Sequence, residues 1–124
     1  MYQFGFEKLE VWQDARKLTT AIYKLTEKFP ESEKFGLTNQ LRRASVSIGA
    51  NIAEGTSRFS AKEQAHFSSI TYGSLMEILN HLIIAFDLGF IVEEELLSMR
   101  NKIQPLSIKI NNLRNSQSAR DKKG

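Results

Sequence analysis

The sequence predicts an all-α protein, an antiparallel four-helix bundle in up-down-up-down order. Apolar residues recur at alternating spacings of three and four in four segments, which is the period of a helix with one buried face. The connections between these segments are short and carry proline, glycine or a capping serine. No segment shows a convincing strand pattern, so the 124 residues are expected to form one domain with a helical core.

The first predicted helix runs from about Glu7 to Phe29. Pro30 should end it, because the residue before a proline is pushed out of the α region. Trp12 flanks the apolar stripe and is expected at the edge of the core. The stripe has the spacing of a bundle seam and consists of Val11, Ala15, Leu18, Ile22, Leu25 and Phe29.

The second predicted helix, Leu37 to Gly55, is apolar on two opposite sides. One face carries Leu37, Leu41, Ala44, Ile48 and Ile52, and the opposite face carries Val46, Gly49, Ala50 and Ala53. A helix that is apolar on two sides is buried on two sides, so the back of this helix is expected to meet another subunit. Gly55 is expected to adopt the left-handed conformation that follows many helices.

The third predicted helix starts at a capping box, Ser60 to Glu63, and stops at Gly89. A weaker stripe of Phe67, Ile70, Ser74 and Ile78 lies behind its core stripe and enlarges the apolar surface of the second helix. Such a surface is too large for a monomer, so the sequence predicts a homo-oligomer. The expected interface consists of Val46, Gly49, Ala50, Ala53, Phe67, Ile70 and Ile78.

The fourth predicted helix opens with three glutamates from Glu93, which suit the positive end of the helix dipole. Pro105 interrupts its pattern and should bend or divide the helix near Asn101. Residues 1–114 are expected to form the bundle, and residues 115–124 are expected to be a polar, disordered, basic tail.

The net charge of +3 comes from the end of the chain, where residues 114–124 hold four basic residues and one acidic residue. The rest is neutral, so the high pI alone says little about nucleic acid. A local excess of positive charge nevertheless includes Arg42, Arg43, Arg58 and Lys62. Phosphate contact is one interpretation of these residues. Solvation, or contact with the acids of a neighbouring subunit, is the other, and the sequence favours neither.

Two polar residues of the second helix need partners. Asn51 borders the core face, and Glu54 lies in the last turn, where a negative charge opposes the helix dipole. We expect a polar network that braces the corner between the second and third helices, in preference to a ligand-binding role. Its members would be Arg43, Ser47, Asn51, Glu54 and Arg58.

Catalysis and metal binding find little support in the sequence. Carboxylate di-metal bundles need two Glu-x-x-His pairs, and the chain has one, Glu63 and His66. There is no cysteine, nucleophile elbow or phosphate-binding glycine loop. We expect no enzyme activity, metal, cofactor or small-molecule substrate. The chain opens without a signal peptide and its longest apolar run is Leu82 to Phe86, so a cytoplasmic protein without a membrane span is expected.

Five motifs occur in the order LEVWQDARKL, IYKLTEKFP, GLTNQLRRASVSIGANIAEG, SRFSAKE and GSLMEILNHL. Over residues 4–92 the chain thereby resembles the 23S rRNA intervening-sequence four-helix-bundle proteins. It departs from them at Gly49, where proline is frequent, and at Thr71 and Tyr72, where alanine and arginine are common. The second departure removes a basic residue from that position.

The resemblance implies an up-down bundle and a ring-shaped homopentamer. Relatives include accessory proteins of diversity-generating retroelements, which bind a reverse transcriptase and nucleic acid through a basic surface. Other relatives are encoded within inserts of ribosomal RNA genes. By motif position, the contact candidates are Arg42, Arg43 and Arg58.

The function expected from these observations is a non-enzymatic, homo-oligomeric scaffold that binds RNA or an RNA-handling protein. An assembly protein without a nucleic-acid role is the alternative, and a metal-dependent bundle enzyme is the third possibility.

Overall fold

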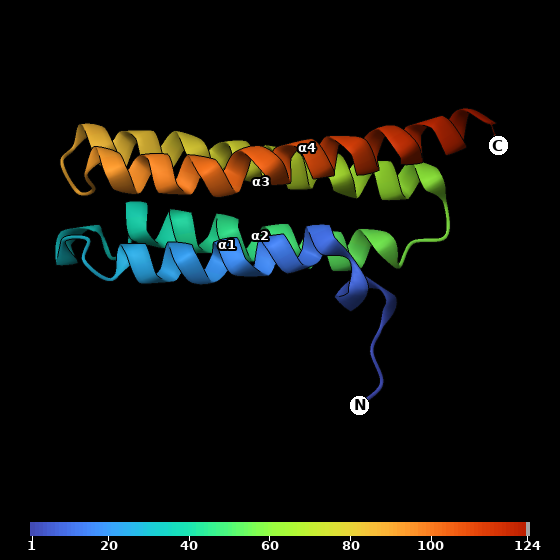
Figure 1. Cartoon of the computed structure of the whole chain (residues 1–124), viewed down its shortest axis with the longest axis horizontal. Helices are drawn as coiled ribbons and strands as arrows, with labels where there is room; N and C mark the ends of the chain where they lie inside the picture. Colours follow the sequence, from blue (N-terminus) through green and yellow to red (C-terminus); the bar gives the residue numbers. More distant parts are fainter. Residues whose placement is uncertain (124) are drawn as a thin grey trace.

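The computed structural model describes residues 1–123, and its four long helices form two layers. The elements in chain order are η1 (Gly5–Lys8), α1 (Glu10–Thr26), η2 (Glu31–Glu33), α2 (Leu37–Thr56), α3 (Ala61–Asp87) and α4 (Glu93–Lys123). Helices α1 and α2 form one layer, and α3 and α4 form the other (Figure 1). None of residues 1–123 forms a strand. The predicted antiparallel four-helix bundle is therefore confirmed.

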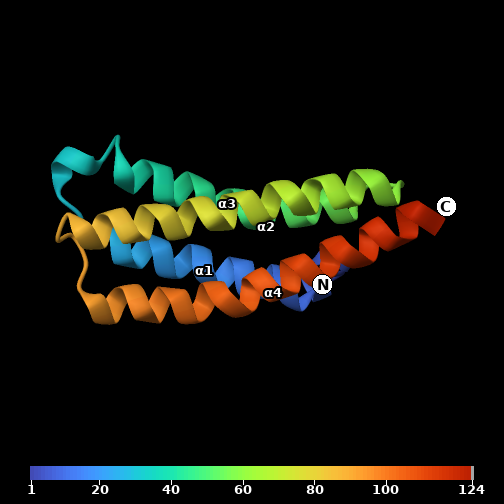
Figure 2. The same ribbon diagram turned by 90° about the horizontal axis from the view of Figure 1, so that it is seen from above.

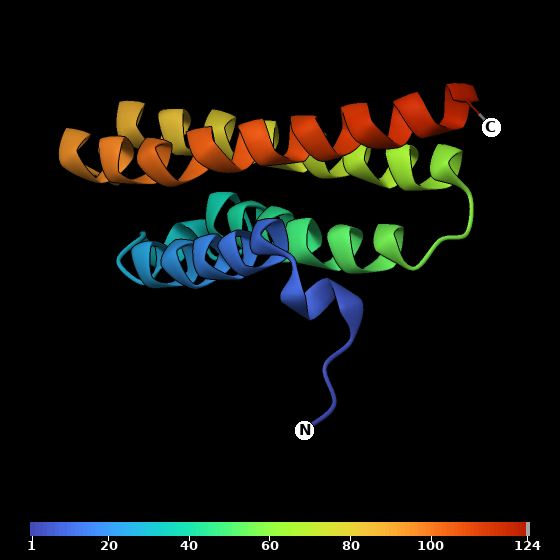
Figure 3. The same cartoon turned by 45° about the vertical axis from the view of Figure 1, so that its right-hand side comes forward.

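The connections divide between the two ends of the bundle. The α1–α2 and α3–α4 connections lie at one end, and the α2–α3 turn lies at the other end, together with the C-terminal part of α4 (Figures 1 and 2). The segment before α1 leaves the bundle and projects away from both layers (Figure 3).

The core is formed by the stripes that the periodicity predicts. Ile22, Ile48 and Leu82 are completely buried, and residues of all four helices surround them. Burying a large aliphatic side chain of this kind stabilises the fold by about 1.5–3 kcal/mol relative to its exposed state.

Helix α1 is shorter than the sequence predicts at both ends. Residues 5–8 form the separate 3-10 turn η1, and the α-helix starts only at Glu10. At the other end the helix stops at Thr26, although Phe29 is still buried in the core. The Thr26 hydroxyl donates a hydrogen bond of 2.8 Å to the Ile22 carbonyl and thereby takes up one carbonyl of the last turn.

Gly55 is not a left-handed residue after α2, as the sequence suggested; it lies inside the helix and is buried. A Cβ atom at this position would lie 2.6 Å from the Cβ atom of Phe67 in α3. Real Cβ contacts are never so short, so Gly55 is needed for the close approach of α2 and α3. The α2–α3 turn begins only after Thr56.

Both predicted ends of α3 are confirmed. Ser60 is the N-cap, and its hydroxyl accepts a hydrogen bond of 3.1 Å from the Glu63 backbone N–H. After the helix, Gly89 has a φ of 79°, the left-handed region that favours glycine. The Phe90 N–H bonds to the Ala85 carbonyl and the Gly89 N–H bonds to the Phe86 carbonyl, the pattern of a Schellman motif.

Helix α4 is a single helix with Pro105 inside it, and it bends midway along its length (Figure 2). The prediction of a disordered tail is wrong for residues 115–123, which continue the helix. Gly124 lies outside the described residues. Gln117 is buried and accepts a hydrogen bond of 2.6 Å from the Ser68 hydroxyl of α3, which fixes the end of α4 to the bundle.

Ion pairs connect α1 and the segment that follows it to α4. Lys109 of α4 pairs with Glu10 at 2.6 Å and also with Asp14. The bond to Asp14, followed by the bond to Glu10, raises the pKa of Lys109. In the segment after α1, Lys28 pairs with Glu95.

Helix α3 is long and apolar enough to cross a membrane by length and composition alone, with a mean hydropathy of 1.2 over its most apolar window. The core helix of a soluble protein meets the same criterion. Here Leu75, Ile78 and Leu82 are completely buried between α3 and its neighbours. Since 28% of the residues in that window are buried, packing within the bundle accounts for only part of the apolar character of this helix.

We predict that Gly55→Ala lowers the free energy of unfolding by about 1–3 kcal/mol, because the added methyl group overlaps Phe67. Gly73→Ala is the matched control. Gly73 lies in α3, where an added Cβ atom meets nothing within 4 Å. The higher helix propensity of alanine should therefore stabilise the fold by up to about 1 kcal/mol. Urea denaturation of both variants and the wild type measures these changes in the free energy of unfolding. Equal effects of the two substitutions would contradict the close approach at Gly55.

We predict that Glu95→Gln destabilises the fold by about 0.5–1 kcal/mol at neutral pH. The Lys28 side chain, followed by the Val92 backbone N–H at 2.9 Å, holds the pKa of Glu95 below its ordinary value of 4.5. A lowered pKa means that the stabilisation is complete above the unfolded-state pKa and is lost as the pH falls through the folded-state pKa. The difference between the wild type and Glu95→Gln should therefore disappear in acid.

Thermal unfolding between pH 7 and pH 3 measures this difference. Glu94→Gln is the control, because Glu94 lies in the same helical turn and makes no ion pair in the described part of the chain. A difference in stability between Glu95→Gln and the wild type that persists in acid would refute the role assigned to the carboxylate.

Candidate nucleic-acid interface and assembly surface

The Arg42 side chain binds to α1 of the same chain. Its Nε donates a hydrogen bond of 2.9 Å to the Thr26 hydroxyl, and its guanidinium lies 4.8 Å from the centre of the Tyr23 ring. A second nitrogen donates to the Tyr23 carbonyl at 3.4 Å. These contacts place a cation at the C-terminal end of α1, where it suits the helix dipole. Arg42 thus fastens α2 to α1, and it has fewer free donors for a phosphate than the sequence suggested.

Arg43 is exposed and lines a shallow groove of about 360 Å³ between α2 and α3. The other lining residues are Asn39, Gln40, Ala44, Ser47 and Glu77. A carboxylate in the same groove weakens its attraction for a phosphate.

The expected polar network is divided into two separate local contacts. The Asn51 side-chain amide donates to the Ser47 carbonyl at 2.8 Å, and the Ser47 hydroxyl bonds across to the Ser74 hydroxyl of α3 at 3.0 Å. Glu54 pairs with Arg58 at 3.4 Å. Within residues 1–123, Arg43 makes no hydrogen bond or ion pair with either group. Ser47 therefore braces α2 against α3, and Asn51 bonds only within its own helix.

Arg58 occupies the corner between α2 and α3. Its guanidinium lies 4.9 Å from the centre of the Phe67 ring, and its Nε is buried without a hydrogen-bond partner. Stacking on an aromatic ring restricts the arginine while leaving most of its donors at the edge of the plane. Arg58 is thus held in one orientation with donors still available.

Gln64 joins this corner to the end of α4. Its side-chain amide donates to the Arg58 carbonyl at 2.8 Å, and its side-chain oxygen accepts from Arg120 at 2.6 Å. Residues that are 62 positions apart in sequence are therefore neighbours through one glutamine. Six residues earlier in α4, Arg114 lies 4.9 Å from the centre of the Tyr72 ring.

These contacts bring basic residues of the α2–α3 turn, α3 and α4 together at one end of the bundle. We call this region the basic end, and its residues are Arg58, Lys62, Arg120, Lys122 and Lys123. The acids close to it in sequence are Glu54, Glu63 and Asp121. Sequence reasoning placed the last three basic residues in a disordered tail. The spacing of Leu106, Ile110, Leu113 and Gln117 is four, three and four, and it could have shown that the helix continues.

The opposite end of the bundle has the opposite charge. Residues 27–36 and 87–95 form the connections and the adjacent helix ends there, and they contain seven acidic residues against two lysines. We call this region the acidic end. The separation of charge gives the bundle one end that attracts polyanions and one end that repels them.

The predicted assembly surface is smaller than the sequence suggested. Val46 is 49% exposed and Ala50 is exposed, so both face outward from α2. Gly49 instead faces Trp12, whose Nε1 would lie 3.5 Å from an added Cβ atom. Ala53 lines a groove of about 400 Å³ against the segment before α1.

On α3, the predicted interface residues differ in exposure. Ile70 is 41% exposed, and Phe67 is partly covered by Arg58. The assignment of Ile78 to the interface is wrong, because this residue is completely buried in the core. Val46, Ala50 and Ile70 remain as outward-facing apolar residues.

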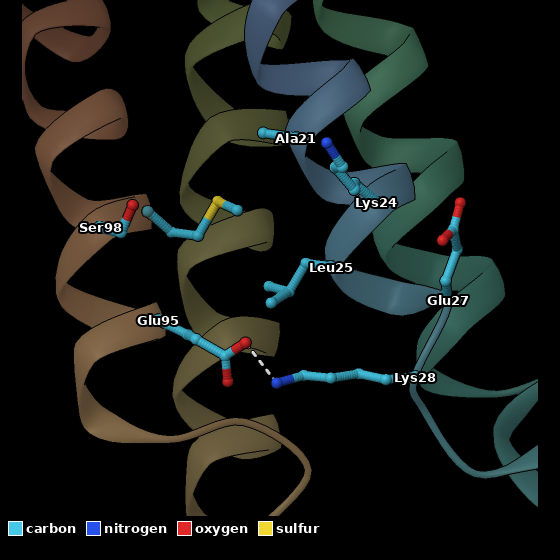
Figure 4. A pocket seen from close by; sticks show the side chains of 8 residues that line it. Ala21, Lys24, Leu25, Glu27, Lys28, Glu95 and Ser98 are labelled. Carbon is cyan, nitrogen blue, oxygen red and sulfur yellow. Dashed lines mark hydrogen bonds and ion pairs between the residues drawn. The ribbon is translucent and has the colours of Figure 1, made fainter.

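A groove of about 400 Å³ lies between α1 and α4 (Figure 4). Ala21, Leu25 and Met99 form its apolar part, and the Lys28–Glu95 ion pair crosses its end. Its other lining residues are Lys24, Glu27 and Ser98. No group of three or more His, Cys, Asp or Glu side chains within residues 1–123 is placed to hold a metal ion.

Comparisons with known proteins agree on a family. A crystal structure at 1.70 Å of a protein of unknown function from the S23 ribosomal protein family of Bacteroides thetaiotaomicron VPI-5482 is similar to this chain, with a TM-score of 0.75 and 21% identity. The match covers 84% of this chain and 97% of that chain. No curated protein matches. The family model of the 23S rRNA-intervening sequence protein matches residues 7–112. The chain belongs to the 23S rRNA-intervening sequence protein family.

Proposed function

We propose that this protein is a non-enzymatic, cytoplasmic scaffold that assembles from copies of itself and binds RNA through the basic end. The observation that carries the proposal is the convergence of Arg58, Lys62 and the last turns of α4 on one end of the bundle. The name of the family refers to the 23S rRNA intervening sequence, which makes RNA the first ligand to test. An RNA-handling protein such as a reverse transcriptase is a second partner of the same scaffold, as the resemblance implies.

Assembly would use the side of the bundle, through Val46, Ala50 and Ile70. These side chains leave apolar surface in water that contact with another copy would remove. They lie on α2 and α3 away from the basic end, so assembly and RNA binding do not compete for the same residues. A homopentamer, as implied by the resemblance, is the proposed form.

Assembly without RNA binding is the competing function. The contacts of Arg42 favour this alternative, because they give that residue a role within the fold. An arginine that bonds to Thr26 and stacks on Tyr23 has a structural role without any ligand. The same argument does not extend to Lys62, which is exposed.

We predict that Val46→Asp dissociates the assembly and leaves the fold intact. A charge placed in a subunit contact should weaken it by more than about 2 kcal/mol, or roughly 30-fold in affinity. Ile108→Asp is the matched control, because Ile108 is equally exposed at 54% but lies on α4. Light scattering at micromolar concentration measures the mass, and circular dichroism measures the fold. A monomeric wild-type protein would contradict assembly altogether.

We predict that replacing Lys62, Lys122 and Lys123 together by glutamine weakens RNA binding. The magnitude of the slope of log affinity against log salt should also fall by about 2 for a single-stranded RNA. Three phosphate contacts are lost, so fewer counterions are released when the RNA binds. The matched control replaces Lys17, Lys24 and Lys34, which are equally exposed and lie away from the basic end. Gel-shift titrations at rising salt measure both slopes. Equal losses in the two triple variants would mean that only net charge matters.

A further inference from the structure

Phe59 is a fully exposed aromatic residue at the basic end. It lies in the turn between α2 and α3, next to Arg58 and one residue before the N-cap Ser60, and its relative exposure is 106%. None of the other residues between 1 and 123 covers its side chain. Packing within the fold therefore gives no reason for an aromatic residue at this position.

The surroundings of Phe59 are basic and held in place. Arg58 is restrained by the Phe67 ring at 4.9 Å, and its carbonyl is tied through Gln64 to Arg120. Lys62 lies in the first turn of α3 and is exposed. Cations from the α2–α3 turn, α3 and α4 thus lie at the same end of the bundle as a ring that is open to solvent.

This combination fits unpaired nucleotides better than a duplex. An exposed ring can stack on the face of a base, while the cations around it contact the phosphates on either side. In a duplex the faces of the bases are covered by their neighbours, so only the phosphates remain for the cations.

We propose that the α2–α3 turn binds single-stranded RNA, with Phe59 stacking on an unpaired base and Arg58, Lys62 and Arg120 contacting the flanking phosphates. The proposal rests on the RNA-binding function proposed above and narrows it to unpaired segments. Protein partners are not required for this contact.

A second exposed aromatic residue provides a comparison within the same chain. Phe35 is 86% exposed and lies in the connection between α1 and α2. Its neighbours in sequence include Glu31 and Glu33, and Lys34 lies 5.7 Å from the centre of its ring. The acidic end repels phosphates, so Phe35 should not bind RNA although its side chain is also largely exposed.

The test is fluorescence anisotropy with the full chain and a labelled RNA of about 10 nucleotides, a length within the range of single-strand binding sites. The RNA is used alone and paired with its complement. Phe59→Ala should weaken binding to the single strand roughly 10-fold, the usual effect of losing one stacked base, and should leave duplex binding unchanged. Phe59→Trp should retain the affinity of the wild type, and Phe35→Ala should have no effect.

Phe59→Leu separates stacking from apolar contact, because leucine is apolar but has no ring. A leucine variant that resembles Phe59→Ala supports stacking, and one that resembles the wild type overturns it. Light scattering of the alanine and leucine variants tests whether Phe59 contacts another copy of the chain instead. A loss of mass in either variant would identify Phe59 as a contact between copies and overturn the proposal.

The controls distinguish the failure of this inference from the failure of RNA binding itself. Wild-type protein that binds single strands and duplexes equally, with no effect of Phe59→Ala, overturns the stacking role and leaves RNA binding in place. Wild-type protein that binds neither RNA overturns RNA binding, and the stacking role falls with it.

Discussion

The close contact between Gly55 and Phe67 is the constraint on which the basic end depends. Without a side chain at residue 55, the Phe67 ring can lie against α2, and the Arg58 guanidinium can stack on the exposed side of that ring. The Arg58 carbonyl then accepts from Gln64, which also bonds to Arg120 of α4. The absence of one methyl group thus allows two helices to approach and positions cations of the α2–α3 turn and of α4.

The fold was largely predictable because its determinants are local and periodic. The spacing of apolar residues identifies the buried face of each helix, and Ser60 and Gly89 mark both ends of α3 by their own chemistry. Gly55 was misinterpreted because a glycine near the end of a helix has the same sequence context whether it provides a left-handed residue or a close contact. Only the position of Phe67, which is set by tertiary packing, distinguishes the two.

The candidate site was less predictable, because a charge in a sequence does not reveal its partner. Arg42 looks like a free cation beside Arg43, yet Thr26 and Tyr23 bind it from a different helix. Ile78 has the spacing of a second stripe, but a helix contacted by two neighbours buries more than one stripe. The residues at the end of α4 are polar and suggest disorder. Their order depends on Gln117, a polar residue that is buried because Ser68 satisfies it.

The separation of the two charged ends bears on how copies could assemble. Contact between the basic end of one copy and the acidic end of the next would neutralise both, and the apolar residues on the side of the bundle would stay exposed. Side-by-side contact through Val46 and Ala50 removes that apolar surface and leaves the charged ends free. In a cyclic assembly of this kind with the helices along the ring axis, symmetry places every basic end on the same rim. A single RNA could then contact several copies, and weak contacts at each turn would combine through their high effective concentration. In such a ring, the modest excess of positive charge at each basic end would add up over several copies.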